Sequence, residues 1–267
     1  MDFPELYFVI GLGQVSVMGL AWLISLPIKN ATVADAFWGL AFISPFWSAI
    51  TIYGPHLWSE RLILLAILVT IWGFRLGVHI MFRNWGKPED FRYAVWRKQY
   101  GSIWWYRSFW QVFVFQGVLV WILSAPLIAT VTNPGSLEWI VLDGFGFLVW
   151  LVGFFFEAVG DWQLMLFRED PANRGKLLTT GLWRYTRHPN YFGEAAQWWG
   201  FWLLACSAGN YWTLFSPLLM TFLLLYISGV RLLEKSLKET KPGYEEYVRQ
   251  TSEFFPLPPL RENENGH

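Results

Sequence analysis

Charge is scarce in this chain. Only 15% of its 267 residues are charged and 54% are hydrophobic, whereas soluble domains carry about 25% charged residues. Twenty basic residues balance twenty acidic ones, so a net charge of zero gives no indication of nucleic-acid binding. Together with its 19 tryptophans, this composition is typical of an integral membrane protein.

Cysteine, metal-binding patterns and nucleotide loops are also missing. A single cysteine, Cys206, excludes an internal disulfide, and its apolar surroundings predict a packing role. The four histidines are scattered without cysteine partners, which argues against a metal site. Gly11-x-Gly13 and Gly144-x-Gly146 have no third glycine at the Rossmann spacing. No basic region precedes the first apolar stretch, so we expect that stretch to remain as a helix rather than to be cleaved as a signal peptide.

The chain does contain long apolar stretches. A helix needs about 20 residues to cross ~30 Å of hydrocarbon. Seven stretches qualify, near residues 6–28, 36–54, 58–82, 110–132, 138–167, 191–208 and 211–233. Lipid does not tolerate open sheet edges, and spans this uniformly apolar exclude a barrel. The predicted fold is an all-α, polytopic membrane helical bundle with seven transmembrane helices in one domain, residues 1–267.

Basic residues gather in three regions of the chain: the connections 83–109 and 168–190 and the segment after 230. The connections 133–138 and 206–211 hold none. With seven spans, all three basic regions lie on the cytoplasmic side, as the positive-inside rule requires. The N-terminus is then expected outside and the C-terminus in the cytoplasm, in a bacterial inner membrane or an endomembrane.

Helical spacing predicts polar stripes on the cytoplasmic half of three spans. They consist of Glu157, Asp161 and Arg168, of Asn190, Glu194 and Gln197, and of Arg231, Lys235 and Lys238. Carboxylates beside apolar spans are costly unless paired, so we expect partners among Arg174, Arg184, Arg187 and Arg231. Snorkelling of the basic residues to the headgroups is the alternative interpretation. An arginine-rich pocket with carboxylates suits a ligand that carries phosphates and hydroxyls.

The most specific motif lies between residues 181 and 194. It reads Gly181-Leu-Trp-Arg-Tyr185, then Arg187-His188-Pro189-x-Tyr191-x-Gly193-Glu194, and the chain closes with Tyr244-x-x-Tyr247 and Phe254-Phe-Pro256. These motifs resemble the C-terminal half of the steroid 5α-reductase family, the 3-oxo-5α-steroid 4-dehydrogenases. The likeness is greatest to the bacterial branch of uncharacterised, DUF1295-like membrane proteins. It is strong over about residues 140–260 and weaker before them.

This resemblance implies a seven-helix membrane oxidoreductase that uses NADPH from the cytoplasmic side. Its substrate would be the 4,5 double bond of a 3-oxo-4-ene steroid or a related lipid enone that enters from the membrane, with no nucleic acid or metal involved. The spans within 1–132 would face the substrate, and residues 138–260 would bind the cofactor. The implied cofactor-binding residues are Lys87, Asp161, Arg168, Arg174, Tyr185, Arg187, His188, Asn190, Tyr191, Glu194, Arg231, Lys235 and Tyr247.

Two charged residues of the N-terminal half are the candidate catalytic groups. Hydride addition to an enone leaves negative charge on the carbonyl oxygen, which a preplaced donor stabilises. The eukaryotic enzymes carry a polarising glutamate in their second span, and Asp35, at the mouth of the second expected span, looks like its counterpart. An interaction with the helix dipole is an equal alternative for Asp35. Arg75 in the third span is a candidate partner, and such a pair would keep Asp35 ionised.

The Arg-His-Pro-x-Tyr core is not unique to reductases of steroids. It is shared with S-adenosylmethionine-dependent isoprenylcysteine and phospholipid methyltransferases and with sterol C14 reductases. The methyltransferases follow with an arginine and paired glutamates, whereas Arg231-Leu-Leu-Glu234-Lys235 has lysine in place of the second acid, which favours an anionic ligand. A methyltransferase is the alternative enzyme, and a lipid- or sterol-binding membrane protein is the alternative without catalysis.

Overall fold

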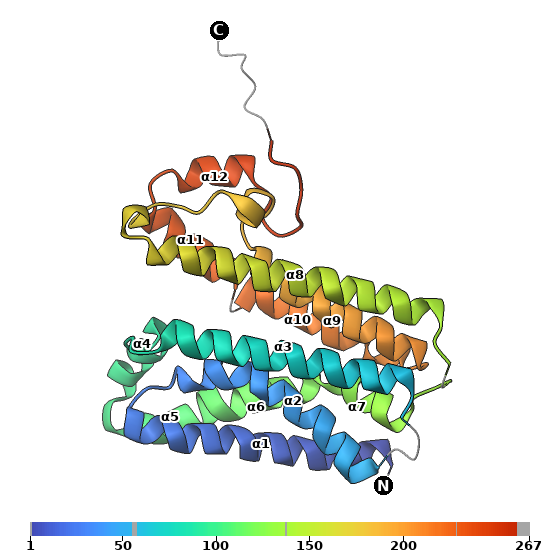
Figure 1. Cartoon of the computed structure of the whole chain (residues 1–267). Helices are drawn as coiled ribbons and strands as arrows, with labels where there is room; N and C mark the ends of the chain where they lie inside the picture. The colour runs from blue at the N-terminus through green and yellow to red at the C-terminus, as the bar shows by residue number, and fades with distance from the viewer. Residues whose placement is uncertain (1, 55–57, 137, 228, 261–267) are drawn as a thin grey trace. The chain divides into compact units, whose positions relative to one another are not determined.

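The structure is a computed structural model that describes residues 2–54, 58–136, 138–227 and 229–260. Within these ranges the regular secondary structure is helical and includes no strand, so the all-α prediction is confirmed. The helices form two compact units (Figure 1). The first comprises Met1–Asp143 and Leu204–Ser216, and the second comprises Gly144–Leu203 and Pro217–His267.

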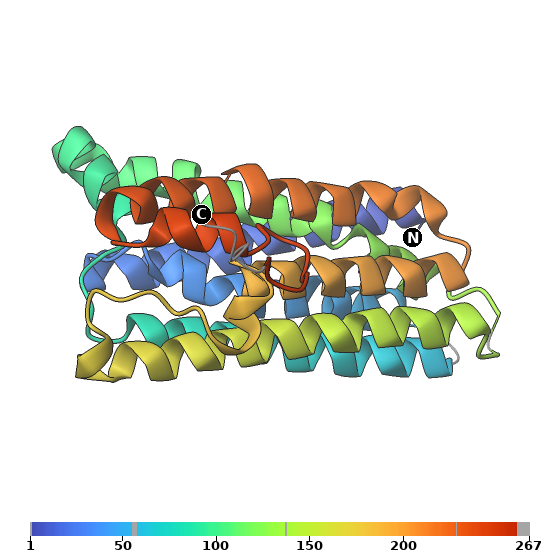
Figure 2. The same ribbon diagram turned by 90° about the horizontal axis from the view of Figure 1, so that it is seen from above.

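The first unit is built on three long helices, α1 (Phe3–Ile28), α2 (Val33–Tyr53) and α3 (Glu60–Asn84). They run side by side with α2 in contact with both of the others (Figures 1 and 2). Two glycines bring α2 and α3 into backbone contact, because a Cβ on Gly39 would lie 2.4 Å from the carbonyl oxygen of Gly73. Close approach through small residues is a common way for helices to associate in lipid, where apolar side chains gain little from leaving their solvent.

The fourth expected span, 110–132, is broken in the structure. It is preceded by α4 (Phe91–Tyr100), η1 (Gly101–Ile103) and α5 (Trp104–Ser108), and it consists of the π-helix η2 (Phe109–Val114), α6 (Phe115–Leu123) and α7 (Ala125–Thr132). The chain bends by 46° between α6 and α7. Pro126 in the first turn of α7 accounts for the break, because proline has no N–H to bond to the preceding turn and its ring clashes with that turn.

The second unit is built on α8 (Val141–Glu169) after its first turn and on most of α9 (Pro189–Ser207). A Cβ on Gly153 would lie 2.6 Å from the carbonyl oxygen of Gly193, so these two helices also meet through glycines. The remaining elements are η3 (Pro171–Asn173), η4 (Gly181–Arg184), α10 (Phe215–Phe222), the π-helix η6 (Leu223–Ile227), α11 (Val230–Thr240) and α12 (Tyr244–Gln250). A further short helix, η5 (Tyr211–Leu214), belongs to the first unit.

Among the described residues, four helices are long and apolar enough to cross a membrane: α1, α2, α3 and α8. The bent stretch Phe91–Leu123 with Ala125–Thr132 raises the number to five. Helix α9 is not among them, since Asn190, Glu194 and Gln197 lower its hydropathy, and Tyr211–Ile227 is a shorter apolar helix. The chain is therefore a multi-pass membrane protein, while seven spans and the sides of the two termini stay predictions.

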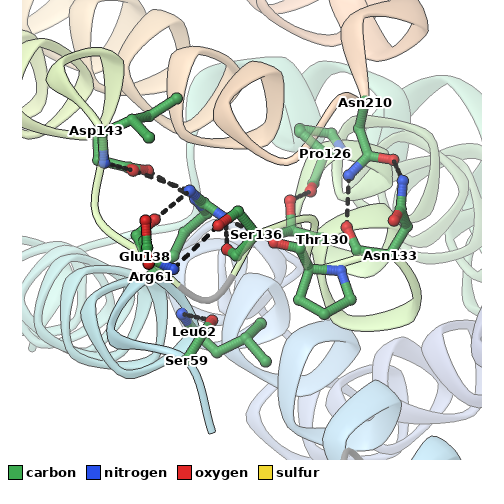
Figure 3. Close-up of polar contacts among 12 residues, drawn as sticks. Ser59, Arg61, Leu62, Pro126, Thr130, Asn133, Ser136, Glu138, Asp143 and Asn210 are labelled. Atoms are coloured by element: carbon green, nitrogen blue, oxygen red, sulfur yellow. Dashed lines mark hydrogen bonds and ion pairs between the residues drawn. The ribbon is translucent and has the colours of Figure 1, made fainter. Parts of the chain in front are cut away.

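A buried arginine organises one end of the first unit (Figure 3). Arg61, in the first turn of α3, is 2% exposed. Its Nε and Nη2 atoms donate to the two carboxylate oxygens of Asp143 at 2.6 and 2.8 Å. Its Nη1 atom donates to the carbonyl oxygens of Pro134 and Ser136 at 2.5 and 3.0 Å. One side chain thus attaches the 133–140 connection to the start of α3.

Replacing Arg61 alone is expected to destabilise the protein strongly. Arg61→Met leaves the Asp143 carboxylate buried without its cation, which costs about 3–5 kcal/mol. The double variant Arg61→Met/Asp143→Leu recovers most of that loss, because neither charge then remains buried. Thermal unfolding of the detergent-purified proteins measures both effects, and Arg83→Met at the exposed end of the same helix is the control. A single variant as stable as the wild type would contradict the assignment.

Candidate functional site

Two loops of the first unit are joined beside the start of α2. The backbone N–H of Ala31 donates to a carboxylate oxygen of Glu89 at 2.7 Å, and the N–H of Asp90 donates to Thr32 Oγ1 at 2.8 Å. Glu89 also accepts two hydrogen bonds from the guanidinium of Arg97, at 2.7 and 2.8 Å. These contacts fix the loop before α4 against the loop before α2, so the first turns of the two helices lie together.

Asp35 lies in the first turn of α2 and is the centre of a polar cluster. Its side chain is 16% exposed, and Arg92 Nη2 lies 3.0 Å from Oδ2. The hydroxyl of Tyr93 donates to Oδ1 at 2.6 Å. The amide of Gln116 donates to the same oxygen at 3.2 Å and reaches the Tyr93 hydroxyl at 3.2 Å. A half-buried carboxylate is therefore held by a cation, a phenol and an amide, which we name the Asp35 cluster.

Arg92 connects this cluster to the loop before α4. Its Nε atom donates to Asp90 at 2.8 Å, while Nη2 reaches Asp35. Burial by itself would raise the pKa of Asp90, but the hydrogen bonds from Arg92 outweigh burial and hold that pKa below its usual range. The positively charged guanidinium thus pairs with two carboxylates at once, and the geometry of the cluster depends on it.

Gln116 reaches the cluster from a helix with irregular winding. It is the second residue of α6 and directly follows the π-helix η2. A π-turn adds a residue to the helical turn and so rotates the side chains that follow, and such turns occur often at functional sites. The Oε1 atom of Gln116 is buried and has no hydrogen-bond partner among the described residues. One acceptor beside Asp35 is therefore left for another group.

Asp35 stands out in the sequence, but its partners do not. Arg92 is there only one of the basic residues that predict topology, and no pattern connects Asp35 with residues 57 and 58 positions away. Gln116 did give a signal, as a lone polar residue within an apolar run. Arg75 is half-buried on α3, and its pairing with Asp35 stays a prediction. Lys87 is exposed, in the loop before α4.

In the second unit, the polar stripes of α8 and α9 meet. Asn190 Nδ2 donates to Asp161 Oδ1 at 3.1 Å, and Gln197 Nε2 donates to Glu157 Oε2 at 2.5 Å. Glu157 and Asp161 are 2% and 6% exposed, so both carboxylates are buried. The partners that these hydrogen bonds provide are amides, where the sequence favoured arginines. Glu194 lies on the same helix as the two amides and is half-buried.

Arg187 is the centre of a second cluster. It is 7% exposed, and its Nε atom donates to Glu234 of α11 at 2.7 Å. Its Nη1 atom donates to the carbonyl oxygens of Thr251 and Val248, at 2.6 and 3.3 Å. His188 Nε2 lies 3.3 Å from the same Glu234 oxygen. This Arg187 cluster joins the start of α9 to α11 and to the end of α12.

The aromatic residues of the motif surround this cluster. The ring of His188 stacks on Tyr191 at 5.6 Å between centroids, and the hydroxyl of Tyr247 donates to the carbonyl oxygen of Trp183. Burial raises the pKa of Tyr247 well above its usual range, so this phenol stays a hydrogen-bond donor. Tyr185, in contrast, is 43% exposed.

Three of the predicted cations lie at the surface of the second unit. Arg168, Arg174 and Arg231 are exposed, and the guanidinium of Arg231 lies over the ring of Tyr226 at 4.2 Å. The side chain of Lys235 lies outside the described residues. A shallow cavity of about 340 Å³ also lies at the end of α8, with a lining that contains none of the predicted residues. Its lining residues are Gln163, Leu166, Phe167, Asp170, Asn173, Leu178, Thr180 and Gly181.

Ten of the predicted cofactor residues differ in the exposure of their side chains. Arg187, His188, Tyr191, Asp161, Asn190 and Tyr247 are engaged in contacts within the second unit. Arg168, Arg174, Tyr185 and Arg231 present exposed side chains. The residue that sequence analysis underrated is Glu234, which stands within the Arg231 motif but was used there only to compare families.

Acid is expected to weaken the Arg187 cluster. Burial alone would raise the pKa of Glu234, but hydrogen bonds from His188 and Arg187 outweigh it and lower the pKa to about 2. A lowered carboxylate pKa stabilises the fold above the unfolded-state pKa, ordinarily about 4.3, and that contribution is lost as pH falls towards 2.

We therefore expect Glu234→Gln to lose less thermal stability than the wild type between pH 4.5 and 2. At pH 7 the variant should be less stable than the wild type by roughly 3 kcal/mol. Unfolding of the detergent-purified protein across this pH range measures both. Glu239→Gln, an exposed position on the same helix, controls for removal of one negative charge. If the stability of the Glu234 variant falls as steeply with decreasing pH as that of the wild type, Glu234 does not cause the acid sensitivity.

Comparisons with known proteins place the chain in a family. No solved structure matches it. A protein of Schizosaccharomyces pombe described as uncharacterized is 28% identical over 295 aligned residues, which cover 96% of this chain and 83% of that protein. A family model described as "Protein of unknown function (DUF1295)" matches residues 21–251, and the family is related to steroid 5α-reductase-like proteins. The match spans both units, and the chain belongs to the DUF1295 family.

Proposed function

We propose that this protein is a membrane-embedded, NADPH-dependent reductase of a carbon–carbon double bond conjugated to a carbonyl group. The substrate is the 4,5 double bond of a 3-oxo-4-ene steroid or a related lipid enone. The observation that carries the proposal is the 2.6 Å hydrogen bond between Tyr93 and Asp35. The relation of the DUF1295 family to steroid 5α-reductase-like proteins supports the same reaction class.

The Asp35 cluster suits polarisation of a carbonyl. The Tyr93 hydroxyl donates to Asp35 in a short hydrogen bond, and the same hydroxyl can donate instead to an oxygen that gains negative charge. Arg92 and Gln116 hold the carboxylate in place while the phenol turns to the incoming oxygen. Because Arg92 and Gln116 stay in place, only the Tyr93 hydroxyl has to reorient towards the oxygen that gains charge. Reduction of the double bond needs a hydride at the β-carbon, which NADPH would supply, and a proton at the α-carbon, which water would supply.

The residues of the second unit fit a dinucleotide that carries phosphates. Exposed guanidinium groups of Arg168, Arg174 and Arg231 can grip phosphate with two donors each. Asp161 and Asn190 offer an acceptor and a donor to ribose hydroxyls or to an amide. NADPH would supply the hydride, and these side chains would bind and orient it. The Arg187 cluster fixes the backbone from which Tyr185, Tyr191 and Glu194 project.

We also propose that the cofactor-binding side of the protein faces the cytoplasm. Seven spans put the connections 83–109 and 168–190 and the segment after 230 on that side, with the N-terminus outside. Arg92, Arg168, Arg174, Arg187 and Arg231 belong to these three regions. The lipid substrate then enters from the membrane, and the soluble cofactor enters from the cytoplasm.

Cofactor preference is the first test. Calorimetry on the detergent-purified protein is expected to show NADPH binding tighter than NADH binding and no binding of S-adenosylmethionine. Arg231→Glu should weaken NADPH binding on the order of 10- to 100-fold, the loss of a charge-assisted contact. Arg107→Glu is the matched control, because Arg107 is also exposed and its guanidinium also lies over a tyrosine ring. Binding of S-adenosylmethionine instead would establish the methyltransferase alternative.

Removal of the Tyr93 hydroxyl tests the catalytic assignment. With a 3-oxo-4-ene steroid as substrate, Tyr93→Phe is expected to lower kcat by about 10²- to 10³-fold, as loss of an oxyanion donor does elsewhere. Its NADPH affinity should stay unchanged, and Asp35→Asn should act in the same direction. Tyr100→Phe on the same helix, with a ring that stacks on Trp104, is the control. Full activity in Tyr93→Phe would remove the Asp35 cluster from the mechanism.

A further inference from the structure

The last described segment, residues 254–260, is apolar but largely uncovered. It carries no charge, and Phe255, Leu257 and Leu260 are 65%, 55% and 71% exposed. Phe254 is buried and anchors the segment to the second unit. Three large, exposed apolar side chains within six residues are unfavourable in water, so they are expected to contact an apolar environment.

The backbone of this segment is suited to an environment without water. From Pro256 to Leu260 only the two leucines have an N–H group, because the other three residues are prolines. Leu257 N–H donates to the carbonyl oxygen of Tyr185 at 3.0 Å, and Leu260 N–H donates to that of Gln250 at 2.9 Å. Every backbone donor in the stretch is therefore satisfied within the protein, which is the condition that lipid imposes.

The segment also contacts the start of α9, which packs on the apolar helix α8. The rings of Phe254 and Phe255 are each 6.0 Å from the ring of Phe192 in the first turn of α9. Phe192 in turn is 5.1 Å from Phe156, within the apolar helix α8 that is long enough to span the bilayer. Phenylalanine and leucine side chains are typical of the apolar faces with which interfacial segments enter the membrane surface.

We propose that residues 255–260 lie in the interfacial layer of the membrane, with Phe255, Leu257 and Leu260 in contact with lipid. The same segment bonds to the motif loop, since Thr186 Oγ1 donates to the carbonyl oxygen of Phe254 at 2.9 Å and Tyr185 accepts from Leu257. The anchor thus attaches the backbone beside Arg187 to the membrane surface. This inference does not depend on the proposed reductase activity.

The alternative to lipid is a soluble protein domain that recognises proline-rich segments and binds residues 255–260. Such domains bind the polyproline II conformation, in which every third residue lies on the same face. Pro256 and Pro259 share that face, and both are half-buried against the protein, whereas the leucines are the outward residues. The proline face is already covered, so the geometry favours lipid.

Site-directed labelling tests the anchor in the full-length protein. In a Cys206→Ala background, single cysteines at Leu257 and Leu260 are labelled with an environment-sensitive fluorophore, and the protein is reconstituted in phosphatidylcholine–phosphatidylglycerol vesicles. Glu253→Cys, an exposed position just before the segment, is the matched control. We expect blue-shifted emission and strong quenching by nitroxide-labelled lipids at both leucine positions, and water-like emission with quenching by aqueous iodide at the control.

Either of two results would overturn the proposal. Water-like emission and iodide quenching at both leucine positions would place the segment in the aqueous phase. Loss of iodide accessibility only on addition of a soluble proline-recognition domain would assign the segment to a protein partner. Gel filtration of each labelled protein, with retention of the wild-type thermal transition, ensures that the probes report on the folded state.

Discussion

Charged groups beside apolar spans are costly unless they are paired, and three of the ion pairs among the described residues join distant parts of the chain. Arg61 pairs with Asp143, Arg92 with Asp35 and Arg187 with Glu234. The partners are 82, 57 and 47 residues apart, so each pair joins segments that are remote in sequence. In each case the arginine also bonds to a loop or to a helix end. The connections between helices are therefore specified by charge rather than by apolar packing.

Such pairs contribute more to a unique arrangement than to net stability. Removing two charges from water costs several kcal/mol, which their attraction and further hydrogen bonds offset only when the geometry is good. Arg61 and Arg187 meet that condition through backbone carbonyl oxygens as well as carboxylates. Alternative helix arrangements would leave these guanidinium groups buried without partners. The free energy lost would exceed what apolar side chains gain by contacting one another instead of lipid. Polar clusters therefore occur where the chain changes direction.

The sequence predicted the long helices closely, because hydropathy and helix length are both local. The expected segments 6–28, 36–54 and 58–82 correspond to α1, α2 and α3. The break at Pro126 and the π-helices η2 and η6 were missed, since they change local hydrogen bonding without changing mean hydropathy. Likewise Asp35 stood out as an isolated carboxylate, whereas its partners Arg92 and Tyr93 depend on tertiary contacts that no spacing encodes. Predictions from composition therefore found the candidate residues better than their partners.

Burial and hydrogen bonding distinguish Arg187, which holds the fold, from Arg231, which lies at the surface. Arg187 belongs to the most recognisable motif of the chain, yet its Nε and Nη1 donors reach Glu234 and two backbone carbonyl oxygens. Its use by a phosphate would require the end of α12 to move. Arg231 is exposed and rests on an aromatic ring, which leaves its planar donors able to turn outward. For the proposed anionic cofactor, Arg231 is therefore a better candidate ligand than Arg187, which shapes the backbone of the second unit.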